Sequence, residues 1–182
     1  KVVDGDGILL LAARWLAARG ELSDRGGTPT VVATVMSNLG LERALERRGI
    51  RMLRTAVGDR SVLEEMLRTG AVLGGEQSGH IIFHNYATSG DGLLTALRVL
   101  EVARAEGAGL DELTRELVRY PQQLVNVRVR RRPPLEELPE VSSEMRRAEE
   151  DFAGSGRILV RYSGTELLAR VMVEGADGER VQ

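Results

Sequence analysis

Hydrophobic residues recur along the first 110 positions in two alternating patterns that differ in length and period. The longer segments carry leucine, alanine and valine at helical spacing and close near a glycine or a basic residue. They predict helices over residues 8–19, 39–48, 61–70 and 91–107.

Shorter apolar runs lie between these segments. The first of them, TVVATVM, is a continuous β-branched stretch typical of a strand covered on both faces. Because helices and strands alternate with short connections, we expect an α/β fold, a three-layer α/β/α sandwich with a largely parallel sheet. The predicted strands are 30–36, 50–57, 71–75 and 80–84, the last as a hairpin or edge strand.

The pattern changes after Tyr120-Pro121. Residues 122–134 alternate as a strand does, a polar helix is expected over about 141–152, and two apolar runs within 159–175 flank a bend. Strand, helix, strand, strand predicts a smaller α+β domain that carries this bend.

A linking helix is expected between the two patterns. Asp111 is a plausible N-cap, and the helix would run over 111–119. We therefore place the sandwich at residues 1–112 and the small α+β domain at 113–182.

The composition narrows the class of protein. The 182 residues include 25 basic and 27 acidic ones, and a net charge of −2 argues against a general binder of nucleic acid or anionic membranes. Cysteine is absent, which excludes disulfides and Cys-based zinc sites and fits a cytoplasmic protein. No apolar run reaches the length of a membrane span. Because the chain starts at Lys1, without Met, we expect a piece of a longer protein.

The bend in LVRYSGTELLARVMVEG has the parts of a phosphate-binding loop. Ser163, Gly164 and Thr165 offer backbone N–H groups and hydroxyls, and glycine lets the backbone approach a ligand closely. Arg161 and Arg170 add charged forks that suit phosphate. The alternative is a hairpin turn with surface arginines. The two arginines and the flanking strands favour phosphate.

The loop GGEQSGH, residues 74–80, follows a predicted strand, and ligands of α/β sheets bind at the carboxyl ends of strands. Glu76 accepts hydrogen bonds, Ser78 donates and accepts them, and His80 can donate. This set suits neighbouring sugar hydroxyls. A turn in which Glu76 caps a neighbouring group is an equal alternative.

Other polar positions have simpler interpretations. Asp59 is expected as an N-cap, with Arg60 beside it able to reach an anion, and Asp91 is expected to cap the long helix. Asp4 and Asp6 are interpreted as turn and cap residues. His80 and His84 lack an evident third ligand, so no metal site is predicted. The basic run of Arg128 and residues 130–132 is interpreted as a solvated strand end.

GGEQSGH, followed some eighty residues later by RYSGTELLARVMVEG, resembles the α-D-phosphohexomutases. TVMSNLGLE, VGDR, GGEQSGHIIF, TSGDG and PQQLVNVRV are most similar to the bacterial phosphoglucosamine mutase branch, in order and spacing over essentially the whole chain. The resemblance implies four domains around one cleft. Residues 1–112 would be the third domain and 113–182 most of the fourth, without its terminal helix.

The resemblance also implies a reaction, the interconversion of glucosamine 6-phosphate and glucosamine 1-phosphate through a phosphoserine and a bisphosphate intermediate. The residues that match the family's site are Arg161, Ser163, Gly164, Thr165 and Arg170 for phosphate, Glu76, Ser78 and His80 for the sugar, and Asp59, Arg60 and Asp91 as further polar groups.

Two parts of the family's machinery do not occur in the sequence. The serine loop and the D-x-D-x-D magnesium loop belong upstream of Lys1, so Mg²⁺ and the phosphoserine are expected only in the full-length enzyme. Leu167 also replaces a usual proline. The chain alone should therefore bind substrate without transferring phosphoryl groups. Its expected partners are a hexosamine phosphate and upstream domains of the same protein. A homodimer is compatible with the sequence, which does not decide the oligomeric state.

Three alternatives remain open from the sequence. The first is a sister mutase acting on glucose or mannose phosphates. The second is a sugar-phosphate binding module without catalysis. The third is a purely structural α/β domain. It would leave the arginines of the bend without a role in ligand binding, and it is the least favoured.

Overall fold

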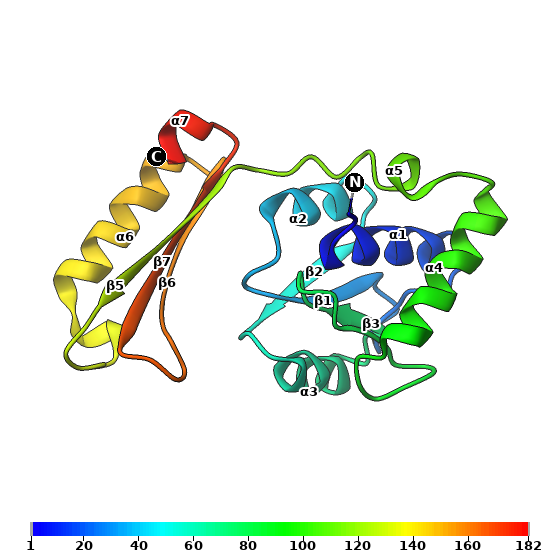
Figure 1. The fold of residues 1–182 in the computed structure, drawn as a ribbon, viewed down its shortest axis with the longest axis horizontal. Coiled ribbons are helices and arrows are strands. Elements are labelled where there is room, and N and C mark those ends of the chain that lie inside the picture. Colours follow the sequence, from blue (N-terminus) through cyan, green and yellow to red (C-terminus); the bar gives the residue numbers. More distant parts are fainter. Residues whose placement is uncertain (1, 182) are drawn as a thin grey trace. The chain divides into compact units, whose positions relative to one another are not determined.

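The computed structural model describes residues 2–181 and divides into two compact units, residues 1–119 (unit 1) and 120–182 (unit 2) (Figure 1). This division falls later than the boundary expected between residues 112 and 113. The reason is that the segment after residue 112 packs on unit 1: Leu113 is 3% exposed within an apolar cluster of that unit, and Glu116 accepts hydrogen bonds from Arg48.

Unit 1 contains one four-stranded sheet in the order β2-β1-β3-β4. β1 runs parallel to β2 and β3, and β4 pairs antiparallel with β3 as an edge strand, so the largely parallel sheet and the hairpin at its edge are confirmed. Figure 1 shows α3 below the sheet and α1 and α2 above it. The elements are α1 (Gly5–Ala18), β1 (Thr30–Thr34), α2 (Leu39–Glu46), β2 (Arg51–Thr55), α3 (Asp59–Thr69), β3 (Leu73–Gly75), β4 (Ile81–Phe83), α4 (Gly92–Glu106) and α5 (Leu110–Leu113).

The side chains of β1 alternate between two apolar cores. Val31 belongs to the cluster that α1 and α2 build, whereas Val32 packs with Val62 and Met66 of α3. Every residue of β1 is buried, which confirms a strand covered on both faces. Burial of aliphatic side chains of this size contributes about 1.5–3 kcal/mol each.

The predicted linking helix over 111–119 is wrong beyond its first turn. α5 ends at Leu113, and its N-cap is Gly109 rather than Asp111. The hydroxyl of Thr114 donates to the carbonyl of Leu110 at 2.7 Å, and the following residues are held by contacts to the rest of unit 1, among them the bidentate pair of Arg48 and Glu116. Backbone hydrogen bonds of single turns, such as that from the amide of Leu117 to the carbonyl of Thr114 at 3.0 Å, and these side-chain contacts hold the segment in place of a continuous helix.

Unit 2 is an antiparallel sheet in the order β5-β7-β6 with a helix, α6, packed against it, in agreement with the predicted α+β pattern. The bend between β6 and β7 is the predicted phosphate-binding loop. The elements are β5 (Gln122–Arg128), the 3₁₀ turn η1 (Leu135–Glu137), α6 (Pro139–Phe152), β6 (Gly156–Tyr162), β7 (Leu168–Gly175) and α7 (Gly178–Val181).

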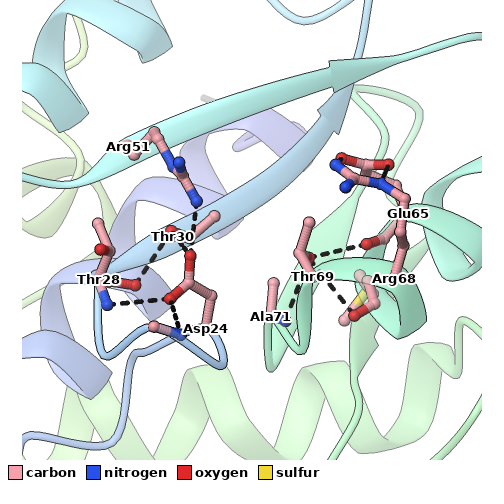
Figure 2. Close-up of polar contacts among 10 residues, drawn as sticks. Asp24, Thr28, Thr30, Arg51, Glu65, Arg68, Thr69 and Ala71 are labelled. Carbon is pink, nitrogen blue, oxygen red and sulfur yellow. Dashed lines mark hydrogen bonds and ion pairs between the residues drawn. The ribbon is translucent and has the colours of Figure 1, made fainter.

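A polar network around Asp24 lies at the amino ends of β1 and β2 (Figure 2). Its carboxylate accepts from the amides of Gly26 and Thr28 at 2.8 and 3.0 Å and from Arg51 at 2.5 Å. The hydrogen bond from Thr28 is the main cause that lowers the pKa of Asp24, and the charge of Arg51 acts in the same direction. Ligands of α/β sheets bind at the carboxyl ends of the strands, so the opposite end of this sheet is the place to look for a ligand site.

Among residues 2–181, no helix combines the length and the apolar character needed to cross a membrane.

Candidate functional site

The loop that follows β3 presents Glu76 at the carboxyl end of the sheet in unit 1. One carboxylate oxygen, Oε1, accepts the backbone N–H of Gly58 at 3.0 Å, which ties the loop after β3 to the start of α3. The loop is a tight turn, because the amide of Gly79 donates to the carbonyl of Glu76, and Gly79 has φ 105°. The Glu76 side chain is only 14% exposed, and its second oxygen is not engaged by this contact.

A pocket of about 460 Å³ opens at this end of the sheet. β1, β2 and β3 run in the same direction, so the residues at and just after their carboxyl ends meet there. The pocket combines carboxylates, an amide and hydroxyls with two apolar side chains, a set that suits a polyhydroxylated ring. Its lining residues are Asp4, Thr34, Met36, Val57, Glu76, Gln77 and Ser78.

The start of α1 forms one wall of this pocket. The amide of Gly5 donates to the carbonyl of Gln77 at 2.9 Å. Asp4 caps α1 by accepting the amide of Gly7, which confirms its interpretation as a cap, and it also pairs with Arg119. Burial works to raise the pKa of Asp4, but the hydrogen bonds from Arg119 and Gly7 outweigh it and leave that pKa below its usual value. Asp4 is therefore ionised beside Glu76 at neutral pH.

Asp6 is a buried residue of α1, not the turn or cap residue that the sequence suggested. Its Oδ2 accepts the amide of Asn38 at 2.8 Å, and Asn38 is the N-cap of α2. The side chain is 0% exposed, and burial raises its pKa to about 6. Asp6 thus connects α1 to the segment that follows β1, which contains Met36 of the pocket.

The remaining predicted residues of unit 1 lie outside the pocket lining. The His80 ring is exposed, with Nδ1 3.4 Å from the hydroxyl of Ser78 and 3.9 Å from Oε2 of Glu76. Arg60 pairs with Glu64 at 2.8 Å on the surface of α3. Asp59 is the first residue of α3, and the N-cap is Gly58, so the capping prediction for Asp59 is wrong. Asp91 caps α4 by accepting the amide of Leu94 at 2.9 Å, as predicted.

In unit 2 the arginines of the predicted phosphate loop face each other. Arg161 of β6 and Arg170 of β7 are direct partners in the antiparallel register, so both side chains lie on one face of the sheet. Burial lowers the pKa of Arg161, and the charge of Arg170 lowers it further. Glu166 pairs with Arg170 at 3.5 Å, while Nε of Arg170 is buried without an acceptor among the described residues. An anion placed here would relieve the repulsion between the two guanidinium groups.

The backbone of this loop is fixed at both ends. Ser163 is 2% exposed, its amide donates to the carbonyl of Leu168 at 2.8 Å, and its hydroxyl accepts the amide of Glu166 at 3.3 Å. Gly164 and Thr165 are exposed between these anchors. Their amides make no hydrogen bond to any part of the chain that the structure describes. Free, adjacent amides beside two arginines are the elements of an anion site.

Within residues 2–181, no three His, Cys, Asp or Glu side chains gather in a way that could hold a metal ion. We therefore assign no metal ligand to these residues.

Sequence reasoning missed part of the pocket and one residue that contacts the predicted phosphate loop. Thr34, Met36 and Val57 lie at or just after the carboxyl ends of β1 and β2, so the rule that identified the loop after β3 applies to them equally. Arg132, interpreted as part of a solvated strand end, donates from Nη1 to the carbonyl of Ser163 at 2.8 Å. No pattern in the sequence indicates that contact.

Comparisons with known proteins agree with this architecture. Residues 4–120 match the sequence model of "Phosphoglucomutase/phosphomannomutase, alpha/beta/alpha domain III", and residues 124–182 match that of "Phosphoglucomutase/phosphomannomutase, C-terminal domain".

Two of the most similar curated relatives are both named phosphoglucosamine mutase. The phosphoglucosamine mutase of Solibacter usitatus is 62% identical over 182 residues, which cover 100% of this chain and 40% of that protein. The phosphoglucosamine mutase of Koribacter versatilis is 60% identical over 174 residues, covering 95% of this chain and 37% of that protein. The chain thus spans about 40% of the length of the curated relatives it matches.

Solved structures share the fold. An N-acetylphosphoglucosamine mutase from Aspergillus fumigatus, in complex with GlcNAc-6P and magnesium, has a TM-score of 0.81 and 20% identity, and covers 100% of this chain and 45% of its own. An N-acetylglucosamine-phosphate mutase, described as a member of the alpha-D-phosphohexomutase superfamily, has a TM-score of 0.78 and 23% identity, with 100% and 42% coverage. The chain therefore belongs to the phosphoglucomutase/phosphomannomutase family, as its motifs predict, with matches to domain III and to the C-terminal domain.

Proposed function

We propose that this chain supplies the substrate-binding groups of a phosphohexomutase that interconverts glucosamine 6-phosphate and glucosamine 1-phosphate. The observation that carries the proposal is the cross-strand pairing of Arg161 with Arg170, whose Nε is buried without an acceptor among the described residues, beside the free amides of Gly164 and Thr165. The names and high identity of the curated relatives support the amino sugar as the substrate.

In this proposal the two units have separate tasks. The loop of unit 2 holds the phosphate that is not being transferred, through Arg161, Arg170 and the amides of the loop. The pocket of unit 1 holds the sugar ring. Glu76 accepts from ring hydroxyls with the oxygen that is not bound to Gly58, and Ser78 donates to or accepts from a neighbouring hydroxyl. Fixed groups of this kind contribute to the rate by orienting the substrate.

The chemistry itself requires groups that we do not assign to residues 2–181. We propose that the phosphoserine and Mg²⁺ of the reaction belong to the rest of a longer enzyme, and that the chain alone binds substrate but does not transfer phosphoryl groups. A cytoplasmic location goes with the proposed substrate. A sister mutase acting on glucose or mannose phosphates is the second candidate, because the same family contains it.

Calorimetric titration tests the proposal. The chain is titrated with glucosamine 6-phosphate, glucose 6-phosphate and inorganic phosphate, beside Glu76→Ala and the matched control Glu46→Ala, which removes an exposed carboxylate of α2. We expect preference for the amino sugar phosphate, weakened about tenfold by Glu76→Ala and not by the control, as for the loss of one charge-assisted hydrogen bond. Equal binding of both sugar phosphates would favour the sister mutase, and no binding of any phosphate would contradict the assignment of the loop.

A further inference from the structure

Arg132 is exposed, as expected for a solvated run of arginines, and its guanidinium also contacts the phosphate loop. Beyond the end of β5 the chain still pairs with the loop, because the amide of Val129 donates to the carbonyl of Leu167 at 3.0 Å. This contact brings residues 130–132 alongside the loop. The Nη1 atom of Arg132 donates to the carbonyl of Ser163 at 2.8 Å and lies 3.4 Å from the carbonyl oxygen of Gly164.

Peptide geometry gives these contacts a consequence for the amides. A trans peptide unit is planar, and its N–H points away from its C=O. No cis peptide bond occurs among the described residues. The carbonyl of Ser163 and the amide of Gly164 belong to one peptide unit, so a carbonyl that points toward Arg132 makes this amide point away from Arg132. In the same way, the carbonyl of Gly164 directs the amide of Thr165 away from Arg132. Two successive amides directed to one side form a concavity for an anion.

We propose that Arg132 is a positioning residue of the phosphate loop. It holds the two carbonyl groups on one side, so that the amides of Gly164 and Thr165 stay available to a phosphate oxygen on the other. Its guanidinium acts on the loop and not on the phosphate. The inference rests on the proposed function, since the anion that it serves is the phosphate of the substrate.

The other contacts of the loop show why Arg132 is needed to hold the two carbonyl groups. The amide and hydroxyl of Ser163 fix the ends of the loop through Leu168 and Glu166. Neither contact involves the carbonyl groups of Ser163 and Gly164, which Arg132 alone engages among the described residues. Loss of Arg132 should therefore leave the fold intact and release only the middle of the loop.

The test follows the amide resonances of Gly164 and Thr165 in the ¹⁵N-labelled chain during titration with inorganic phosphate. Three variants are compared: Arg132→Met removes the donor, Arg132→Lys restores one, and Arg131→Met removes a neighbouring exposed charge as the control. We expect both amides to shift in the unchanged chain, and Arg132→Met to weaken phosphate binding about five- to tenfold, the size of one lost hydrogen bond. Arg132→Lys should recover part of that loss, and Arg131→Met should bind phosphate like the unchanged chain.

The outcomes separate this inference from the function on which it rests. If the unchanged chain binds phosphate and Arg132→Met binds it equally well, the inference is overturned and the phosphate loop stands. An equal loss in Arg131→Met and Arg132→Met would also overturn it, because net charge would then explain the effect. If phosphate shifts neither amide in the unchanged chain, the proposed function fails, and the inference fails with it.

Discussion

Arg161 and Arg170 are direct cross-strand partners, so β6 and β7 place two guanidinium groups side by side on one face of the sheet. Like charges directly opposite each other in a sheet are destabilising. Arg170→Met should therefore leave the melting temperature in phosphate-free buffer unchanged or slightly raised. The stabilisation that phosphate adds to the unchanged chain should disappear, because the site has lost one of its charges.

Differential scanning fluorimetry with and without inorganic phosphate measures both effects. Arg146→Met, which removes an exposed arginine on α6, is the matched control and should keep the phosphate effect. A variant Arg170→Met that melts lower without phosphate, yet gains as much from phosphate as the unchanged chain, would show that the pair has a structural role only.

Much of the fold was predictable because hydrophobic periodicity is a local signal. β1 is buried on both faces, and its unbroken β-branched run indicates that directly. The predictions that failed concern segments whose structure depends on contacts with residues far away in the sequence. Residues 114–119 have a helical pattern, but Glu116 pairs with Arg48 in an earlier part of unit 1, and only the folded chain shows this contact.

The residues of the candidate site also fall into two groups, those that the sequence identifies and those that only the fold brings to the site. Glu76 and Ser78 follow a strand, so position in the sequence identifies them. Asp4 joins the same pocket only because the amide of Gly5 meets the carbonyl of Gln77, residues that lie far apart in the sequence. Arg132 was missed for the same reason, since its contact with the Ser163 carbonyl comes from the pairing of β5 with β7.

Gly5 is required where α1 meets the loop of the pocket. A Cβ atom at this position would lie 2.0 Å from the carbonyl oxygen of Glu76 and 2.9 Å from the carbonyl carbon of Gln77, both backbone atoms that cannot move alone. Gly5→Ala should destabilise the chain by about 1–3 kcal/mol in urea unfolding, as overpacking does, and should weaken sugar-phosphate binding.

Gly92 provides the matched control for that substitution. It is also the first residue of a helix, α4, but a Cβ atom there would meet nothing within 4 Å. Gly92→Ala should be neutral or stabilising by up to about 1 kcal/mol, because alanine restricts the unfolded chain. Equal destabilisation by both substitutions would contradict the role assigned to the contact between Gly5 and Glu76.

Asp91 separates a capping role from a role in the site. Its carboxylate accepts the amide of Leu94, and the residue does not line the pocket. Asp91→Ala should cost about 1 kcal/mol of stability, the usual value of an N-cap, and should leave the calorimetric affinity for glucosamine 6-phosphate unchanged. A loss of affinity without a loss of stability would instead assign Asp91 to the site, as the resemblance to the family implies.

Asp6 should make the stability of the chain depend on pH in the opposite sense to an ordinary carboxylate. Burial raises its pKa from 3.8 to about 6, so between these values the folded chain binds a proton that the unfolded chain has lost. The contribution of Asp6 to the free energy of unfolding is complete below pH 3.8 and is lost as the pH rises through about 6, a change of about 3 kcal/mol. Asp6→Asn keeps an acceptor for the amide of Asn38 and has no charge to gain. Between pH 5 and pH 7.5, its free energy of unfolding in urea should therefore decrease less than that of the unchanged chain. If the unchanged chain and Asp6→Asn respond to pH alike, the raised pKa of Asp6 has no part in the stability of unit 1.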